Sequence, residues 1–176
     1  MGRERAMTLA VLALAAASLV PAASGLPAVP KCYNEALTLP AGRLEGTAGD
    51  DVMLGTAGND VMKGLGGDDT ICGGGGDDTI FGGTGRDSIR GDAGHDRLYG
   101  GAGWDELRGD DGDDRLYGEG CDWLQGNVGN DVLLPGAQAG VDCAGIAAEG
   151  GPGKDRFVTD GIGDLELRGG LGVDTV

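Results

Sequence analysis

The chain has 176 residues and a formal net charge of −16, and 39 of its residues are glycine. A strongly acidic chain is a poor partner for nucleic acid, whose phosphates are bound by basic side chains, so we predict no nucleic-acid binding. Because glycine loses more backbone entropy on folding than other residues, we expect the chain to need stabilisation beyond its apolar core.

Residues 1–25 have the pattern of a secretory signal peptide. Arg3 and Arg5 precede an apolar run from Met7 to Val20, and small residues suited to cleavage follow this run. The run is short for a membrane span, so we expect a secreted, extracellular chain without a stable span; a single membrane anchor is the alternative. Residues 26–45 contain three prolines and are interpreted as a lead-in that caps the first repeat.

Residues 46–134 form a nonapeptide repeat. Every ninth residue from Gly46 to Gly118 is glycine, an aspartate recurs at the same period, and a large apolar residue stands two positions after each aspartate. Each repeat therefore has a glycine-rich half suited to a tight turn and a half with the out–in–out alternation of a β-strand. One such strand buries little alone, but stacked copies cover one another. We predict an all-β fold, a parallel β-roll in which two repeats make one coil and two parallel sheets face each other.

The predicted core contains one apolar residue per repeat. The inward rows are Met53, Ile71, Ile89, Leu107 and Leu124 on one sheet and Met62, Ile80, Leu98, Leu116 and Leu133 on the other.

The loop aspartates of alternate repeats are expected to stack in the same way, about 4.8 Å apart. The two edges of the roll take Asp51, Asp69, Asp87, Asp105 and Asp122, and Asp60, Asp78, Asp96, Asp114 and Asp131. Carboxylates at this spacing repel one another unless a cation lies between them. Among hard cations, calcium tolerates irregular cages of many oxygens, whereas magnesium prefers a regular octahedron.

The pattern loosens after Gly118. The copy from Gly118 to Gln125 is one residue short but keeps Asp122 in phase. Residues 135–149 are interpreted as a degenerate insertion, and residues 150–176 as weaker C-terminal repeats.

Four cysteines in an exported chain indicate disulfides, for which the sequence leaves three pairings. We favour Cys121 with Cys143, which would staple the insertion to the roll, and Cys32 with Cys72. Free thiols are the alternative.

Residues 46–134, and more weakly 150–176, resemble the haemolysin-type calcium-binding repeats of the RTX family. The runs GGGGDDTIF (73–81) and GGTGRDSIR (82–90) are near the consensus GGxGxDxUx, in which U is a large aliphatic residue. The resemblance implies a parallel β-roll, an extracellular protein that orders on meeting calcium, and calcium held by loop aspartates and glycine carbonyls. If each ion bridges loops two repeats apart, about eight ions would bind.

The metal ligands expected from this resemblance are the ten aspartates of the two edges and a set of loop glycines. These glycines are Gly49, Gly58, Gly64, Gly67, Gly73, Gly74, Gly76, Gly82, Gly83, Gly85, Gly91, Gly94, Gly100, Gly101, Gly103, Gly109 and Gly112. Many family members are exported through a C-terminal signal, whereas this chain has an apparent N-terminal one, and many carry a toxin, lipase or protease domain before the repeats, which we do not expect here. A fragment of a larger RTX protein is therefore an alternative interpretation.

No catalytic motif accompanies the repeats. His95 is the only histidine and holds a variable loop position, and neither HExxH nor GxSxG occurs. Aspartate pairs such as Asp77 and Asp78 resemble glycosidase carboxylates, but their repetition in every loop favours metal ligation. We therefore predict a non-catalytic structural or adhesive module.

The outward strand positions contain an aromatic ladder. Phe81, Tyr99 and Tyr117 are eighteen residues apart and should stack on successive coils, with Arg97 and Arg115 beside them. Such a ladder suits an extracellular polysaccharide or an acidic cell-surface partner, which makes a stand-alone carbohydrate-binding accessory module the alternative function. Cross-strand stacking that only stabilises the roll is the simpler explanation.

Overall fold

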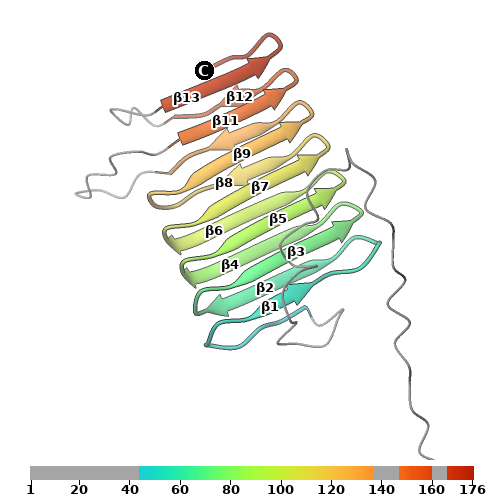
Figure 1. Ribbon diagram of the computed structural model, residues 1–176, viewed down its shortest axis with the longest axis vertical. Helices are drawn as coiled ribbons and strands as arrows, with labels where there is room; N and C mark the ends of the chain where they lie inside the picture. Colours follow the sequence, from blue (N-terminus) through green and yellow to red (C-terminus); the bar gives the residue numbers. More distant parts are fainter. Residues whose placement is uncertain (1–43, 137–146, 160–165) are drawn as a thin grey trace, which may run out of the picture.

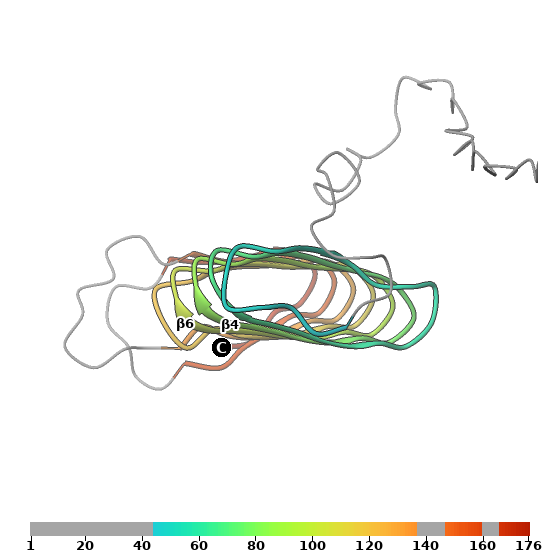
Figure 2. The same ribbon diagram turned by 90° about the horizontal axis from the view of Figure 1, so that it is seen from below.

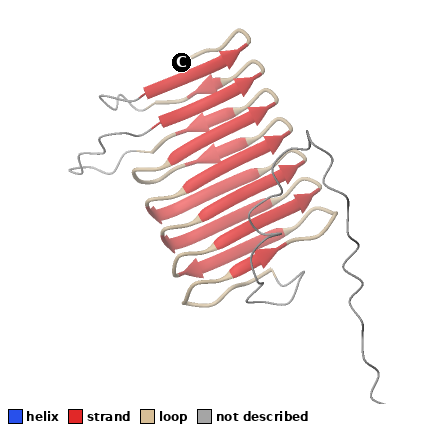
Figure 3. Ribbon diagram, in the orientation of Figure 1, coloured by secondary structure: helices blue, strands red, loops and turns tan. Residues whose placement is uncertain are grey.

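The computed structural model describes residues 44–136, 147–159 and 166–176, and all regular structure in them is β-strand (Figures 1 and 3). The predicted signal peptide, residues 26–43 of the lead-in and residues 137–146 of the predicted insertion lie outside the described residues.

Thirteen short strands form two parallel sheets. The seven-stranded sheet contains β1 (Val52–Leu54), β3 (Thr70–Gly75), β5 (Ser88–Ala93), β7 (Glu106–Asp111), β9 (Trp123–Val128), β11 (Ala147–Pro152) and β13 (Glu166–Leu171). The six-stranded sheet contains β2 (Val61–Gly66), β4 (Thr79–Gly85), β6 (Arg97–Gly103), β8 (Arg115–Tyr117), β10 (Val132–Leu134) and β12 (Arg156–Phe157). Consecutive strands alternate between the sheets, so each pair of repeats makes one flattened coil (Figure 2). The predicted parallel β-roll is confirmed.

The core lies between the two sheets as two rows of side chains in register. Met53 is paired with Ile71, and Ile71 with Ile89, so each large apolar residue covers its equivalent one coil along. All ten predicted inward residues are at most 1% exposed. Ala148 and Phe157 extend the same core toward the later strands. The inward rows are therefore those predicted from the period of the repeat.

The inward residues stay in register even where a copy of the repeat is shorter or longer than nine residues. Leu107 on β7 pairs with Leu124 on β9, seventeen residues later, so the missing residue is taken from the loop and not from the strand. Leu124 pairs with Ala148 on β11, twenty-four residues later, so the extra residues fall between β10 and β11 in the sequence.

Two of the cysteines occur in the described residues. Cys72 and Cys121 are both disulfide-bonded, and the described chain contains no free cysteine. Their predicted partners, Cys32 and Cys143, lie outside the described residues.

Glycine is required at the second position of several repeats because the backbone turns there with positive φ. At Gly83 φ is 121°, and an added Cβ would lie 2.3 Å from the carbonyl oxygen of Leu65. The requirement is not absolute, because Asp92 and Asp110 hold the equivalent position at φ 71° and 73°. Aspartate tolerates this left-handed conformation better than most side chains.

Candidate metal centre

The loop aspartates lie in two buried rows, one on each edge where the chain turns between the sheets. Each predicted aspartate is at most 8% exposed. The rows are built by the backbone, because the N–H of nine of the ten predicted aspartates donates to Oδ1 of the aspartate one coil along. The distance is 2.9 Å from Asp69 to Asp87 and 2.8 Å from Asp78 to Asp96. One oxygen of each such carboxylate is thus used to position the row.

The second oxygen of most of these carboxylates has no hydrogen-bond partner. Oδ2 is buried and unpartnered in Asp69, Asp78, Asp87, Asp96, Asp105, Asp114, Asp131 and Asp155. A buried ionised oxygen without a partner is costly, and native structures rarely leave one in this state. Eight such atoms in two rows indicate that these oxygens have a positively charged ligand in the functional protein.

The space beside each unpartnered oxygen is kept open by the first glycine of the repeat. A Cβ added at Gly91 would lie 2.1 Å from Oδ2 of Asp96, and one at Gly109 would lie 2.1 Å from Oδ2 of Asp114. These glycines do not have positive φ, so close approach, and not turn geometry, requires them. The missing side chain therefore lets the carboxylate approach the backbone of the turn, beside the carbonyl oxygen of the next coil.

Burial raises the pKa of these carboxyl groups. Desolvation is the largest cause, and neighbouring carboxylates of the same row raise the pKa further, so that it reaches about 8 in Asp114. The pKa is about 7 in Asp105 and Asp131 and about 6 in Asp78. Without a cation the rows hold protons at a pH where free aspartate is ionised, and a bound cation would favour the charged form.

The carboxylates alone do not make a metal cage. Within the described ranges, no three Asp, Glu, His or Cys side chains form a group that could hold a metal ion, and each coil brings one buried carboxylate to each row. The remaining ligands would have to be backbone carbonyls. Carbonyl oxygens do line these turns: an added Cβ at Gly85 would lie 2.1 Å from the oxygen of Gly67, one coil earlier. A donor set made only of oxygens fits calcium.

Three predicted ligands differ from the others, because protein groups already satisfy the second oxygen. Oδ2 of Asp51 accepts from the N–H and hydroxyl of Thr47 at 2.6 and 3.0 Å. The N–H and hydroxyl of Thr56 donate to Oδ2 of Asp60 in the same way, and the N–H of Gly120 donates to Oδ2 of Asp122 at 3.0 Å. In the second of these loops the first glycine is still required, since a Cβ at Gly55 would lie 2.1 Å from the carbonyl oxygen of Gly73, but a Cβ at Gly58 would have no contact closer than 3.9 Å.

Asp155 was not among the predicted ligands. It is 1% exposed, its Oδ1 accepts the N–H of Asp131 at 3.0 Å, and its Oδ2 is unpartnered. Its signal was present in the sequence, because Gly150 and Phe157 stand around it at the spacing of the repeat. Because the insertion before Gly150 breaks the nine-residue period, the sequence does not show to which row Asp155 belongs. The register between strands places it after Asp131.

The stacked parallel coils and the one buried loop carboxylate per nonapeptide define a β-roll of the calcium-binding repeat class. The chain matches a family model described as the RTX calcium-binding nonapeptide repeat, which spans four copies of the repeat. Overlapping matches to this model cover residues 45–80, 73–105, 81–116, 99–133 and 118–141. These segments cover more than half of the chain, which therefore belongs to the RTX calcium-binding repeat family, as the resemblance indicated. A comparison with the curated proteins finds no match. None of the described residues belongs to an apolar helix of membrane-spanning length.

Proposed function

We propose that the protein is secreted, that its β-roll folds on binding calcium, and that the folded roll serves as a non-catalytic structural or adhesive module. One observation carries the proposal: eight buried loop carboxylates each have an oxygen without a hydrogen-bond partner. The proposed ligands are these carboxylates and the carbonyls of the loop glycines. If each ion bridges loops two repeats apart, the number of calcium ions is about eight.

Calcium binding and folding should be one event. The core holds one large apolar residue per strand, while two rows of like-charged carboxylates are buried beside it. Without a cation, repulsion and desolvation oppose the compact state, and the ordering of many glycines adds an entropic cost. The free energy of calcium binding is then part of the free energy of folding. Affinities of extracellular calcium modules, about 10⁻⁴ to 10⁻³ M, suit such a protein.

Export is supported by the N-terminal signal pattern and by the disulfides. Structural disulfides persist in oxidising compartments, and Cys72 and Cys121 are both disulfide-bonded. A non-catalytic role is supported by the state of His95, which is exposed and whose Nδ1 accepts the N–H of Asp113 at 2.8 Å. That nitrogen is part of the loop stacking, as expected for a structural loop residue.

The test is far-UV circular dichroism of the mature chain, titrated with calcium, then with chelator, and with magnesium as the control. We expect a reversible coil-to-β transition that calcium induces and magnesium does not. Full β-structure without metal at neutral pH would show that the core and the disulfides hold the fold alone. A chain that stays disordered at millimolar calcium would refute calcium-induced folding.

A further inference from the structure

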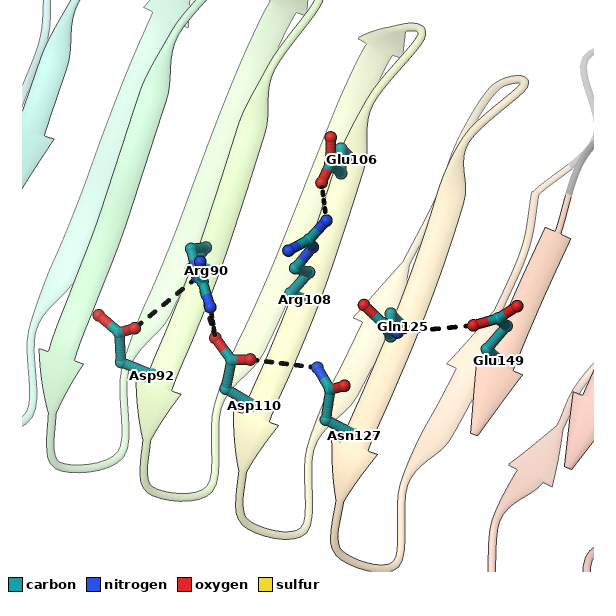
Figure 4. A network of polar contacts seen from close by, with 8 residues as sticks. All are labelled: Arg90, Asp92, Glu106, Arg108, Asp110, Gln125, Asn127 and Glu149. Atoms are coloured by element: carbon teal, nitrogen blue, oxygen red, sulfur yellow. Dashed lines mark hydrogen bonds and ion pairs between the residues drawn. The ribbon is translucent and has the colours of Figure 1, made fainter. Parts of the chain in front are cut away.

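The arginines on the outward faces of the two sheets differ in whether they form ion pairs. On the seven-stranded sheet, Arg90 and Arg108 are paired in register on β5 and β7. Arg90 forms an ion pair with Asp110 at 2.8 Å, and Arg108 forms one with Glu106 at 2.5 Å (Figure 4). Oδ1 of Asp110 also accepts from Asn127, so the carboxylate itself is fully used. The positive charges of this face are neutralised within the protein.

The six-stranded sheet carries an equivalent pair of arginines that form no ion pair within the described chain, although Arg115 lies close enough to the exposed Asp113 to contribute to the lowered pKa of that carboxyl. Arg97 on β6 and Arg115 on β8 are also in register, flanked by Thr79 and Val132, and Arg156 follows Val132 on β12. Like charges directly opposite each other on neighbouring strands are destabilising. Among the described residues, no carboxylate forms an ion pair with any of the three.

A fourth cation, Lys63, belongs to the adjacent row of outward side chains, where it is in register with Glu45 one coil earlier. That row continues through Phe81, Tyr99 and Tyr117, the predicted ladder. All four cations are exposed. We call Lys63, Arg97, Arg115 and Arg156 the basic strip; it runs along the roll on a chain whose net charge is −16.

The aromatic ladder is stacked too closely to bind a sugar by its ring faces. The ring centroids of Phe81 and Tyr99 are 4.8 Å apart with planes at 12°, and those of Tyr99 and Tyr117 are 4.5 Å apart at 5°. Each ring therefore covers the face of the next, and the row presents mainly ring edges. This geometry stabilises the sheet and leaves the cations beside it as the groups available to a partner.

We propose that the basic strip is the docking surface for a linear acidic polysaccharide whose carboxylates pair with Arg97 and Arg115. The inference rests on the proposed function, because it names the partner of the adhesive module. Guanidinium groups bind carboxylates in a bidentate manner, and the neighbouring parallel strands β6 and β8 place Arg97 and Arg115 side by side, about 4.8 Å apart along the roll. A thin, extended chain suits the strip because exposed Asp77 and Asp113 lie in the loops that precede β4 and β8. A wide polyanion such as duplex DNA would meet these carboxylates.

The test measures binding of the calcium-loaded protein to immobilised hyaluronate, with neutral dextran and duplex DNA as comparison surfaces. We expect binding to hyaluronate that weakens with added salt, and none to dextran. The double variant Arg97→Gln/Arg115→Gln should lose at least about tenfold in affinity. The matched control is Arg90→Gln/Arg108→Gln, which removes the same charge at the same spacing from the opposite sheet and should change affinity less than about twofold. If that control fails to fold, Arg168→Gln replaces it, since Arg168 is 62% exposed on the seven-stranded sheet.

Circular dichroism in calcium is recorded for every variant, which separates the two proposals. A protein that orders in calcium but does not bind hyaluronate overturns the docking proposal and leaves the calcium-dependent roll intact. Equal loss in both double variants, equal binding to dextran, or stronger binding to DNA would each overturn it as well. Failure of the calcium transition itself counts against the proposed function, and hyaluronate binding is still measured on the same sample.

Discussion

The hydroxyl of Thr56 donates to Oδ2 of Asp60 at 2.9 Å, and the N–H of the same threonine donates to that oxygen at 2.6 Å. In Asp78 and Asp96, further along the same edge, the equivalent oxygen has no partner. The protein thus closes the first end of this carboxylate row with its own donors, and Thr47 does the same for Asp51 on the other edge. Interior and end carboxylates look alike in the sequence, but only the interior ones have a second oxygen without a protein hydrogen-bond donor.

Asp96→Asn should therefore impair the calcium response more than Asp60→Asn. At position 96 the new amide nitrogen would face the space assigned to the cation, whereas the second oxygen of Asp60 already has protein donors. We expect the calcium midpoint of folding to rise by about tenfold or more in Asp96→Asn, a loss typical of damage to metal sites, and by less than about twofold in Asp60→Asn. The midpoint is read by circular dichroism, and the stoichiometry by calorimetry. Equal shifts would show that both carboxylates have the same role.

Gly91→Ala and Gly58→Ala should also differ, although both glycines were predicted as ligands. The added Cβ at position 91 would lie 2.1 Å from Oδ2 of Asp96 and 2.8 Å from the oxygen of Gly109. At position 58 it would meet nothing closer than Oγ1 of Thr56, at 3.9 Å. Overpacking of this kind costs about 1–3 kcal/mol or more. Urea unfolding in saturating calcium should show that loss of unfolding free energy for Gly91→Ala, and almost none for Gly58→Ala. A larger loss in Gly58→Ala would contradict the close approach of Asp96 to Gly91.

The inward row should dominate the stability of the calcium-loaded roll. Leu98 is fully buried and pairs with Ile80 and Leu116 on the neighbouring strands. Leu98→Ala should lower the free energy of unfolding by about 2–5 kcal/mol, the range for large-to-small changes in a core. The control is Leu65→Ala, because Leu65 is 46% exposed and alanine keeps the same Cβ at its positive φ. Similar losses in the two variants, measured by urea unfolding, would indicate that metal sites alone hold the fold.

The sequence predicted the fold and the core because both follow from period. A residue repeated every nine positions, with two repeats per coil, must stack on its equivalent eighteen positions later, and Met53 and Ile71 do so. The partners of individual oxygens and charges do not follow from period. Arg90/Arg108 and Arg97/Arg115 have the same spacing, yet only the first pair is neutralised. Arg90 is neutralised by Asp110, which holds a left-handed turn position, and Arg108 by Glu106 on its own strand, and no repeat pattern specifies either carboxylate.

Opposite pH dependence should distinguish the calcium-free from the calcium-loaded protein. Desolvation raises the pKa of Asp114 to about 8 and that of Asp105 and Asp131 to about 7, from an unperturbed value of 3.8. Between about pH 4 and pH 8 the calcium-free folded state thus binds more protons than the unfolded chain. Its free energy of unfolding should be highest below about pH 4 and should fall as the pH rises through this range.

Calcium reverses the sign because it binds the ionised carboxylates, so the stabilisation it provides should grow as the pH rises from about 6 to about 8. The measurement is the β-sheet signal in circular dichroism from pH 4 to pH 8, on protein dialysed free of calcium and on protein at saturating calcium. We expect calcium-free β-structure to be retained near pH 4 and lost toward pH 8, where calcium restores it. A calcium-free protein that becomes steadily more stable from pH 4 to pH 8 would show that the aspartate rows are not held in the buried, unpartnered state described above.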